Sequence, residues 1–477
     1  MSIQVFITLI AVVFSLAAYW YVGARAAYGA KTSSDFLGAG RSLDSRQISH
    51  TWFASTVAFG TAAFYYMQIV PIWGWVVLFA SIGTYALGQW IAIKQAKSAF
   101  ELSQTPSSIT KALLDHTGST FSKKFIDLMN YFQSVSIIFL EIFLGITIFT
   151  YLLPDNANTV QTMFLLGFCA VTFAYVSHGG LRSVVASDTV QFYLILLGLG
   201  LLLLSATSTG LGNVNDGKSF IDLTPTAAAP DIALYFVFAL LVNLSTSLGQ
   251  IAAWQKILSA KNAQEAMSGG TRGVVFTSLA FAVFVLVAGV YNASGSPVSE
   301  VGQFFDNVAM SLGAFGAFIA LPIVFTAMVA AIVSTVDSAA IAAVLAWQSE
   351  ANDEEMTRGQ KRNSMIALLV TLVLAASGFL YVTFYDLSFL SFLLPVAFFA
   401  YSVTAFYAPL IFTLVRSPQR LRSKNFVAAG LVLGFVIVAF GSFLEAKLGT
   451  GNYTYQIATT LTALVVNAGL SIKLGRN

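Results

Sequence analysis

The stretch Ala330–Ala340, AAIVSTVDSAA, lies deep inside an apolar segment that runs from about residue 313 to 347. Small and hydroxyl side chains recur there at helical spacing, on one face: Ala331, Ser334, Thr335 and Ser338. Asp337 lies next to that face. Such groups are costly in hydrocarbon without partners, and their oxygens suit a hard cation such as sodium. The alternative is structural, with Ser and Thr bonding back to helix carbonyls and joining helices.

The composition places the whole chain, 1–477, in a lipid bilayer as a single all-α transmembrane domain. Of its 477 residues, 57% are hydrophobic and 9% are charged, whereas soluble domains carry about 25% charged residues. The single cysteine excludes a disulfide framework, and the three scattered histidines argue against a zinc or haem site. No His, Cys or paired-acid cluster has catalytic spacing, so we expect neither an enzyme nor a nucleic-acid partner.

Thirteen apolar segments are long enough to cross a bilayer, at about 20 residues each. They cover roughly 3–23, 48–70, 74–93, 128–152, 160–177, 188–206, 232–254, 273–293, 313–347, 364–384, 386–415, 425–444 and 454–472. Pro395 predicts a kink or break in the eleventh segment. If the N-terminus lies outside, every Lys and Arg except Lys218 and Lys447 falls in an inward loop. The positive-inside rule then predicts a cell (inner) membrane protein with a cytoplasmic C-terminus.

Two of these segments look interrupted at matching depths. The second has Gly60 and Thr61 near its middle, and the seventh has a polar run from Asn243 to Gln250. The two lie five segments apart, so they cross the bilayer in opposite directions. Gly-broken or polar helices at matching positions of inverted halves point to a transporter binding site. Gly and Ser at a single such place more often serve helix packing.

Four short motifs resemble those of the sodium/solute symporter family. They are Ser34–Leu43 (SDFLGAGRSL), Thr105-Pro106, Gly179–Val184 (GGLRSV) followed by Ser187, Asp188 and Gln191, and Gln255–Lys261 (QKILSAK). The resemblance implies a leucine-transporter-type fold, with five-plus-five inverted repeats at about 48–206 and 232–415. One helix, 3–23, would precede the repeats, and two, 425–444 and 454–472, would follow them.

The resemblance also implies sodium (Na+) as the coupling ion, held between the first and eighth core helices. Its ligands would be the carbonyls of Ala58, Thr61 and Ala331 and the hydroxyls of Ser334 and Thr335. A two-sodium pattern in some relatives would add Asp188, Asp337 and Ser338. The family has a hydroxyl where this chain has Asp337, which therefore strengthens a second cation site, carries a proton, or pairs with Arg182. These alternatives stay open.

The solute site should lie near the midplane between core helices 1, 3, 6, 8 and 10. Candidate lining residues are Ala62, Phe64, Tyr65, Tyr66, Gln133, Ser136, Thr246, Ser247, Gln250, Phe392 and Phe399. Glu141 is either a proton or substrate-ammonium partner or a protonated carboxyl bonded to a neighbouring helix.

The identity of the solute is constrained by comparison with relatives. Sugar-transporting relatives carry a Glu-Gln pair where this chain has Phe64 and Tyr65, which argues against a hexose. Proline-transporting relatives have Asp in place of Gly60, which argues against proline as the solute. An aromatic pocket with few hydrogen-bonding groups would suit an amino acid, a carboxylate or a quaternary amine.

The leading hypothesis is a sodium-coupled symporter that imports a small organic solute by alternating access. A proton-coupled symporter, using Asp337, Asp188 or Glu141, is the first alternative. A transporter-like solute sensor is the second. The sequence leaves the oligomeric state open.

Overall fold

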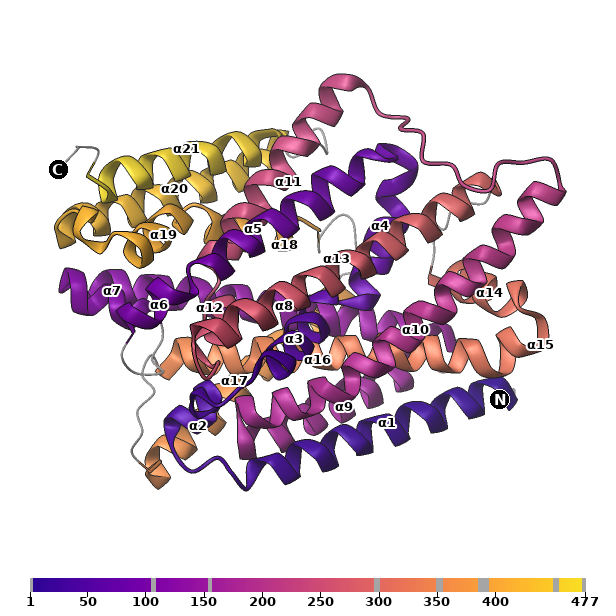
Figure 1. The fold of residues 1–477 in the computed structure, drawn as a ribbon, viewed down its shortest axis with the longest axis horizontal. Helices are drawn as coiled ribbons and strands as arrows, with labels where there is room; N and C mark the ends of the chain where they lie inside the picture. The colour runs from indigo at the N-terminus through magenta and orange to yellow at the C-terminus, as the bar shows by residue number, and fades with distance from the viewer. Residues whose placement is uncertain are drawn as a thin grey trace.

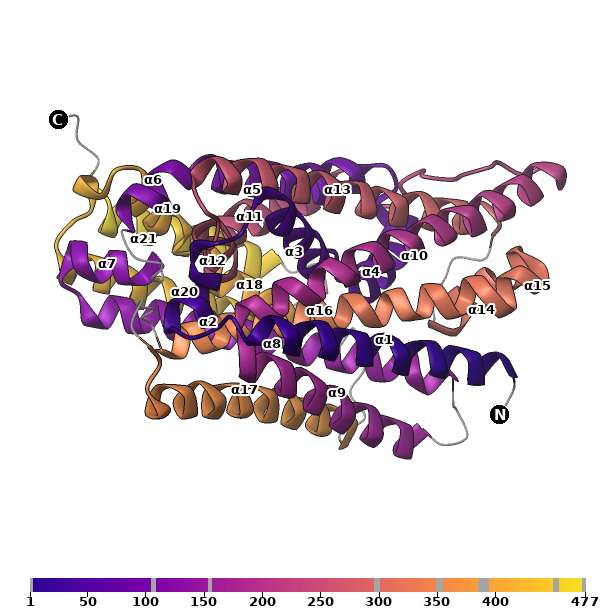
Figure 2. The same cartoon turned by 60° about the horizontal axis from the view of Figure 1, so that its bottom comes forward.

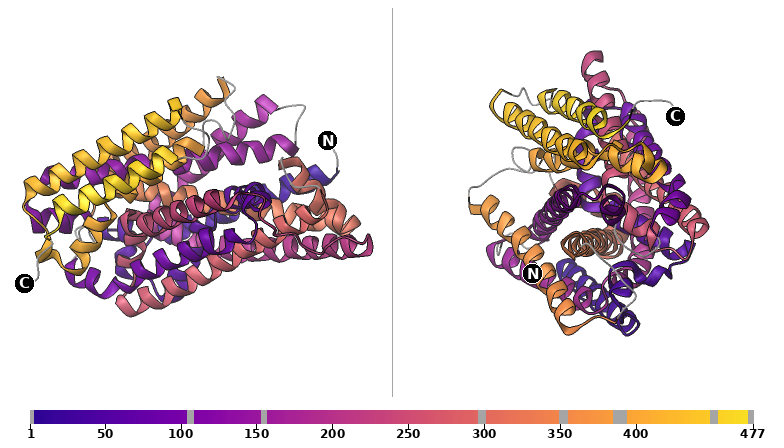
Figure 3. Two further views of the ribbon diagram at one scale, coloured as in Figure 1. Left: turned by 90° about the horizontal axis from the view of Figure 1, so that it is seen from above. Right: turned by 90° about the vertical axis from the view of Figure 1, so that its left-hand side faces the viewer.

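The computed structural model describes residues 3–103, 109–152, 157–295, 301–348, 355–384, 394–448 and 454–473, most of them helical. Most helices run along the long axis of the molecule, as Figure 1 and the end-on view of Figure 3 show. The elements are α1 (Ile3–Ala27), α2 (Ser33–Gly38), η1 (Ala39–Arg41), α3 (Ser45–Val57), α4 (Phe59–Trp73), η2 (Leu78–Gly83), α5 (Thr84–Lys94), α6 (Ala96–Leu102), α7 (Ile109–Thr117), α8 (Thr120–Leu152), α9 (Ala157–Gly179), α10 (Leu181–Asn215), α11 (Ala229–Gly249), α12 (Ile251–Leu258), α13 (Ala263–Ala293), α14 (Val301–Ser311), α15 (Gly313–Phe315), η4 (Gly316–Ala320), α16 (Leu321–Gln348), α17 (Arg358–Phe384), α18 (Leu394–Ala405), α19 (Ala408–Arg416), η6 (Pro418–Arg420), α20 (Lys424–Leu448) and α21 (Thr454–Ser471). Within these ranges β-pairing is confined to three isolated bridges.

Nine helical stretches of the described residues are long and apolar enough to cross a membrane, and the bent pair α3–α4 is a tenth candidate. The chain is therefore an all-α multi-pass membrane protein. The predicted segments 74–93, 160–177 and 454–472 also contain helix, in η2 with α5, in α9 and in α21, although they fall outside those ten candidates. The helix α1 begins at one end of the molecule and α21 finishes at the other (Figure 1).

The second predicted segment is broken, two residues before the position that the sequence suggested. Helix α3 ends at Val57 and α4 begins at Phe59, with a bend of 58° between the two. Ala58 at the junction is left-handed, with φ 39° and ψ 54°. This conformation costs an L-residue such as alanine roughly 1–2 kcal/mol, so the surrounding packing must hold the break in place.

The seventh predicted segment is broken at the end of its polar run. Helix α11 ends at Gly249, Gln250 is extended, and α12 begins at Ile251. A Cβ at Gly249 would collide with the backbone oxygen of Thr404, which explains the glycine.

The eleventh predicted segment breaks later than its proline. Pro395 lies in the first turn of α18, where proline is tolerated, whereas the described break comes at Phe406 and Tyr407, before α19.

Helix α16, which carries the hydroxyl row, is the centre of the core. It contacts α1, α3, α8, α9, α10 and α17, and Figure 2 shows it running among them. Every residue from Leu321 to Ala346 except Ile323 is buried. A helix that is apolar nearly all round is expected to be enclosed by others. Its few polar side chains must therefore find partners on neighbouring helices or face an internal cavity.

Three of the four motifs meet beside the N-terminal end of α10. Arg182 donates to Asp35 at 2.5 Å, and a Cβ at Gly180, with φ 54°, would collide with the Phe36 carbonyl. Gln255 Nε2 donates to the Leu37 carbonyl at 2.7 Å. These motifs build one face of the scaffold. The fourth motif, at 105–106, lies outside the described residues.

Candidate functional site

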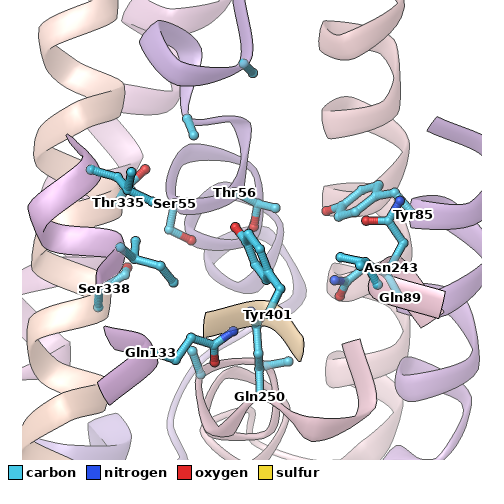
Figure 4. Close-up of a pocket in the computed structure, with 18 of the residues that line it drawn as sticks. Ser55, Thr56, Tyr85, Gln89, Gln133, Asn243, Gln250, Thr335, Ser338 and Tyr401 are labelled. Atoms are coloured by element: carbon cyan, nitrogen blue, oxygen red, sulfur yellow. The ribbon is translucent and has the colours of Figure 1, made fainter. Parts of the chain in front are cut away.

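Both helix breaks border one internal cavity of about 370 Å³, shown in Figure 4. Ala58 lines it at the first break and Gln250 at the second. The rest of the wall comes from α3, α4, η2, α5, α8, α11, α12, α13, α16 and α18. This volume is within the range of small-molecule sites, roughly 300–1,000 Å³.

One wall of the cavity carries hydroxyl groups from two helices. Figure 4 shows Thr335 and Ser338 of α16 on the same side as Ser55 of α3. Thr335 Oγ1 donates to the Ala331 carbonyl at 2.9 Å, which leaves its lone pairs for another donor or a cation. Ser338 Oγ is buried and has no hydrogen-bond partner within the described part of the chain.

Behind that wall, Asp188 of α10 ties three helices together. Ser334 Oγ of α16 donates to its Oδ1 at 2.5 Å, and Thr51 of α3 donates to its Oδ2. Both carboxylate oxygens are therefore engaged, and the residue is fully buried. The hydroxyl of Ser334 points to this carboxylate, and Ser334 is not among the residues that line the cavity.

Asp337 lies in the same buried region, one helical turn from Ser334. Tyr175 of α9 donates to its Oδ2, and its Oδ1 has no hydrogen-bond partner among the residues that the structure covers. A pairing with Arg182 is wrong, because Arg182 pairs with Asp35 instead. Two fully buried carboxylates thus lie on the packed helices α10 and α16, because Asp188 accepts from Ser334, one helical turn from Asp337.

The backbone oxygens expected at a sodium site belong to the first break and to α16. The Ala58 carbonyl accepts the Ala62 amide at 2.7 Å, and the Ala331 carbonyl accepts Thr335. Ala58 and Thr335 line the same cavity. The side chain of Thr61 lies outside the described set, although its backbone belongs to the first turn of α4.

Lys256 of α12 is a member of this site that the sequence reasoning missed. Its Nζ donates to Ser55 Oγ and lies 5.7 Å from the centre of the Trp52 ring. The side chain is 9% exposed and lines the cavity. Lys256 lies in the QKILSAK motif, which served only as a mark of family resemblance, and as a cation near the end of a predicted segment it was counted with the inward-loop residues.

Five of the predicted solute-site residues line the cavity, and so does Glu141; the five are Ala62, Tyr65, Tyr66, Gln133 and Gln250. Glu141 is 3% exposed, and it lines the same cavity as Tyr401 of α18. Gln133 donates to Thr404 Oγ1 at 3.2 Å. Figure 4 shows Gln133, Gln250 and Tyr401 between the two polar walls.

Other predicted solute-site residues point elsewhere. Phe64 packs on Phe304 and Phe399 on Phe132, each with ring centres 5.6 Å apart.

Ser136 and Ser247 donate back to helix carbonyls, at 2.9 and 2.6 Å, as the structural alternative predicts for serines in a membrane helix. Phe392 and the side chain of Thr246 lie outside the described residues.

A second polar wall was also missed. Tyr85 and Gln89 of α5 and Asn243 of α11 cluster there (Figure 4). The Tyr85 hydroxyl and Gln89 Oε1 are buried and have no hydrogen-bond partner within the described ranges. This wall adds hydrogen-bonding groups that the predicted lining residues did not include. Tyr85 and Gln89 stand four residues apart, so their spacing already placed them on one helix face.

No protein-family model and no curated protein sequence matches this chain. Among solved structures, it is similar to a Na+-coupled sialic acid symporter in a substrate-bound, outward-open state, described as revealing a novel Na+ site. That match has 14% sequence identity, covers 98% of this chain and 99% of the other, and has a TM-score of 0.71. The chain therefore has the leucine-transporter-type fold of that protein.

Two further solved structures show weaker similarity. A nucleobase-cation-symport-1 family transporter, in a closed conformation with bromovinylhydantoin bound, has 14% identity over 91% of this chain and 94% of its own. MhsT in complex with L-phenylalanine has 15% identity, and the match covers 88% of this chain and 98% of MhsT. Both TM-scores are 0.47, too low to support a conclusion.

Proposed function

We propose that this chain belongs to the sodium/solute symporter family and imports a small organic solute together with sodium by alternating access. One observation carries the proposal: two chain breaks, at Ala58 and Gln250, border the same cavity as the hydroxyl wall of Thr335 and Ser338. Broken helices around a central cavity are the arrangement that secondary transporters use for solute and ion. A sensor that binds the solute without moving it would need no ion site.

The membrane arrangement proposed with this function has thirteen crossing helices. Ten belong to two inverted repeats, at about 48–206 and 232–415. The N-terminus lies outside and the C-terminus in the cytoplasm. The separation of the first and last helix ends in Figure 1 supports an odd number of crossings.

The proposed sodium site uses oxygens of the first break and of α16. The carbonyls of Ala58, Thr61 and Ala331 and the hydroxyls of Thr335 and Ser334 are its ligands. Thr335 and Ala58 already share the cavity wall. Ser334 would have to turn from Asp188, or bring that carboxylate along as a further anionic group.

A second cation site is proposed at Asp188, Asp337 and Ser338. The support is the concentration of acidic groups: two fully buried carboxylates on packed helices, and an unsatisfied hydroxyl on Ser338, which follows Asp337 in the chain. Buried carboxylates are stable only with cations, protons or strong hydrogen-bond donors nearby.

The proposed solute is an amino acid, a carboxylate or a quaternary amine, rather than a sugar. Glu141 favours the members of this set that carry a cationic group, because its carboxyl lines the cavity near Tyr401. Tyrosine faces at Tyr65 and Tyr66 also suit a cation. The unsatisfied groups of Tyr85 and Gln89 would bind a polar group at the other wall.

A thermal-shift screen of a solute library against the purified protein, with sodium or with choline, tests the proposal. We expect stabilising solutes whose effect requires sodium, and uptake of these solutes into proteoliposomes driven by a sodium gradient. Glu141→Gln should weaken binding of cationic solutes, whereas Glu101→Gln, at an exposed position of α6, should not. A library-wide absence of sodium-dependent stabilisation and uptake would reject the proposal.

Proton coupling is the second candidate, favoured by the unsatisfied Oδ1 of the buried Asp337. A carboxyl oxygen without a donor is typical of a protonated acid. Uptake driven by a pH gradient in the complete absence of sodium, and lost in Asp337→Asn, would select this candidate.

A further inference from the structure

The central site contains a built-in cation. Lys256 is the cationic residue among the described residues that line the cavity. Its ammonium is held by Ser55 Oγ and by the Trp52 ring, both on α3. Ser55 and Thr51 connect it to the buried carboxylate of Asp188.

The link from Lys256 to the carboxylates passes through one short chain of contacts. Ser55 Oγ, which receives the ammonium, donates to the Thr51 carbonyl at 2.5 Å. The Thr51 hydroxyl in turn donates to Asp188, which accepts from Ser334 as well. The ammonium is therefore connected to Asp188 through Ser55 and Thr51, and among the described residues it forms no direct ion pair with Asp188 or Asp337.

We propose that Lys256 is a tethered counter-ion that competes with sodium for this carboxylate region, so that a bound sodium ion releases the Lys256 ammonium from Ser55. The inference rests on the proposed sodium site. It adds a residue from the second broken helix to a site otherwise built from α3, α4, α10 and α16. No family motif assigns Lys256 this part.

The competition follows from charge. Asp188 and Asp337, if both are ionised, carry two negative charges, and Lys256 supplies one positive charge. A sodium ion and an ammonium near the same carboxylates repel one another strongly in a medium of low dielectric constant. Each cation therefore weakens the binding of the other, and the coupling must be reciprocal.

The position of Lys256 makes release possible. Its ammonium is at the end of a flexible four-carbon stem, and the cavity lies next to it because Trp52 and Ser55 line the same wall. The residue follows the break at Gln250 on the short helix α12. The Lys256–Ser55 hydrogen bond thus joins the two broken helices directly, and sodium would control that junction.

The test is a sodium titration of the purified full-length protein without solute, at constant ionic strength with choline as the replacement ion. Binding of radioactive sodium is the readout. Lys256→Gln should bind sodium about tenfold more tightly than wild type, within the range typical of site coupling. The sodium affinity of Lys256→Arg, which keeps the charge, should stay near that of the wild type. The matched control is Lys261→Gln, an exposed lysine five residues further on, which should not change sodium affinity.

Tighter binding is a result that simple structural damage does not produce. Unchanged or weaker sodium binding in Lys256→Gln would overturn the inference. If that variant does not fold, Ser55→Ala serves, because removal of the anchoring hydroxyl should also tighten sodium binding. Unchanged sodium affinity in Ser55→Ala would then overturn the inference. Wild-type protein without saturable sodium binding would reject the proposed function, and with it this inference. Normal wild-type binding with a negative result in the variants rejects the inference alone.

Discussion

Two acidic sites in this molecule are built differently. At the scaffold face, Asp35 receives the backbone amides of Lys31 and Thr32 at 3.2 and 3.1 Å and a direct ion pair from Arg182. In the centre, Asp188 receives only hydroxyls, and Asp337 receives one hydroxyl. The charge of Asp35 is neutralised by Arg182. Asp188 and Asp337 keep negative charge that a bound cation would neutralise. This is the physical difference between a structural acid and a candidate binding acid.

The scaffold acid is held in its charged form. Burial alone would raise the pKa of Asp35, but the backbone amides of Thr32 and Lys31 and the positive charge of Arg182 outweigh it, and the pKa lies below its usual value of 3.8. This carboxylate thus belongs to the helix cap and the loop junction rather than to the cavity.

The largest expected effect comes from Asp188→Asn. The amide keeps the shape but loses the charge and one acceptor, so Ser334 and Thr51 cannot both donate as before. Loss of one partner from a buried charged cluster costs about 3 kcal/mol, equivalent to roughly 100-fold weaker sodium binding.

Asp35→Asn is the matched control for that change. It should leave sodium binding unchanged in the same radioactive-sodium assay, because its hydrogen bonds and ion pair lie at the scaffold face. Equal losses of sodium affinity in Asp188→Asn and Asp35→Asn would contradict the distinction between a structural and a binding acid.

An intermediate effect is expected from Thr335→Val, which removes one hydroxyl without changing the volume. A hydrogen bond or ligand bond to a charged group is worth about 1.5–3 kcal/mol, so sodium affinity should fall by at least roughly tenfold. The control is Thr326→Val on the same helix, whose buried hydroxyl donates to the Pro322 carbonyl at 2.6 Å. If the Thr326 variant loses sodium affinity and the Thr335 variant keeps it, the site has been placed on the wrong turn of α16.

The smallest effect concerns the scaffold pair and appears in stability. The pKa of Asp35 is lower in the folded protein than in the unfolded chain, so its contribution is fully present above pH about 4 and is lost as the pH falls through the folded-state pKa. The melting temperature of the wild-type protein should therefore be slightly higher than that of Arg182→Gln at pH 7, and this difference should shrink below pH 4. Melting curves in detergent across this range measure it. A difference that grows on acidification would contradict this assignment of charge.

The fold was largely predictable because the relevant signals are local and repeated along the chain. Apolar runs predicted the all-α membrane fold, and the spacing of Ser334, Thr335 and Ser338 predicted one face of α16. The first break was displaced by two residues because Ala58 adopts a glycine-like conformation that only the surrounding packing can impose.

The missing parts of the site depend on partners from distant segments. Tyr175 donates to Asp337 from α9, and Lys256 of α12 is connected to Asp188 through Ser55 and Thr51. Tyr175 has no local sequence signal, and the motif that contains Lys256 indicated a family and not a role in the site. Arg182 was an open alternative for Asp337 because sequence alone does not show that Asp35, 147 positions away, is the partner. Tyr85 and Gln89 were overlooked because the solute site was sought on other helices.

The central claim is that a monovalent cation binds where the break at Ala58 meets α16. Thallium(I), a monovalent cation with strong anomalous scattering, can locate the site in crystals grown without sodium. The account predicts an anomalous peak in contact with the Ala58 carbonyl and the Thr335 hydroxyl, which disappears when sodium is added. A peak elsewhere that sodium displaces, with none at this position, would contradict it.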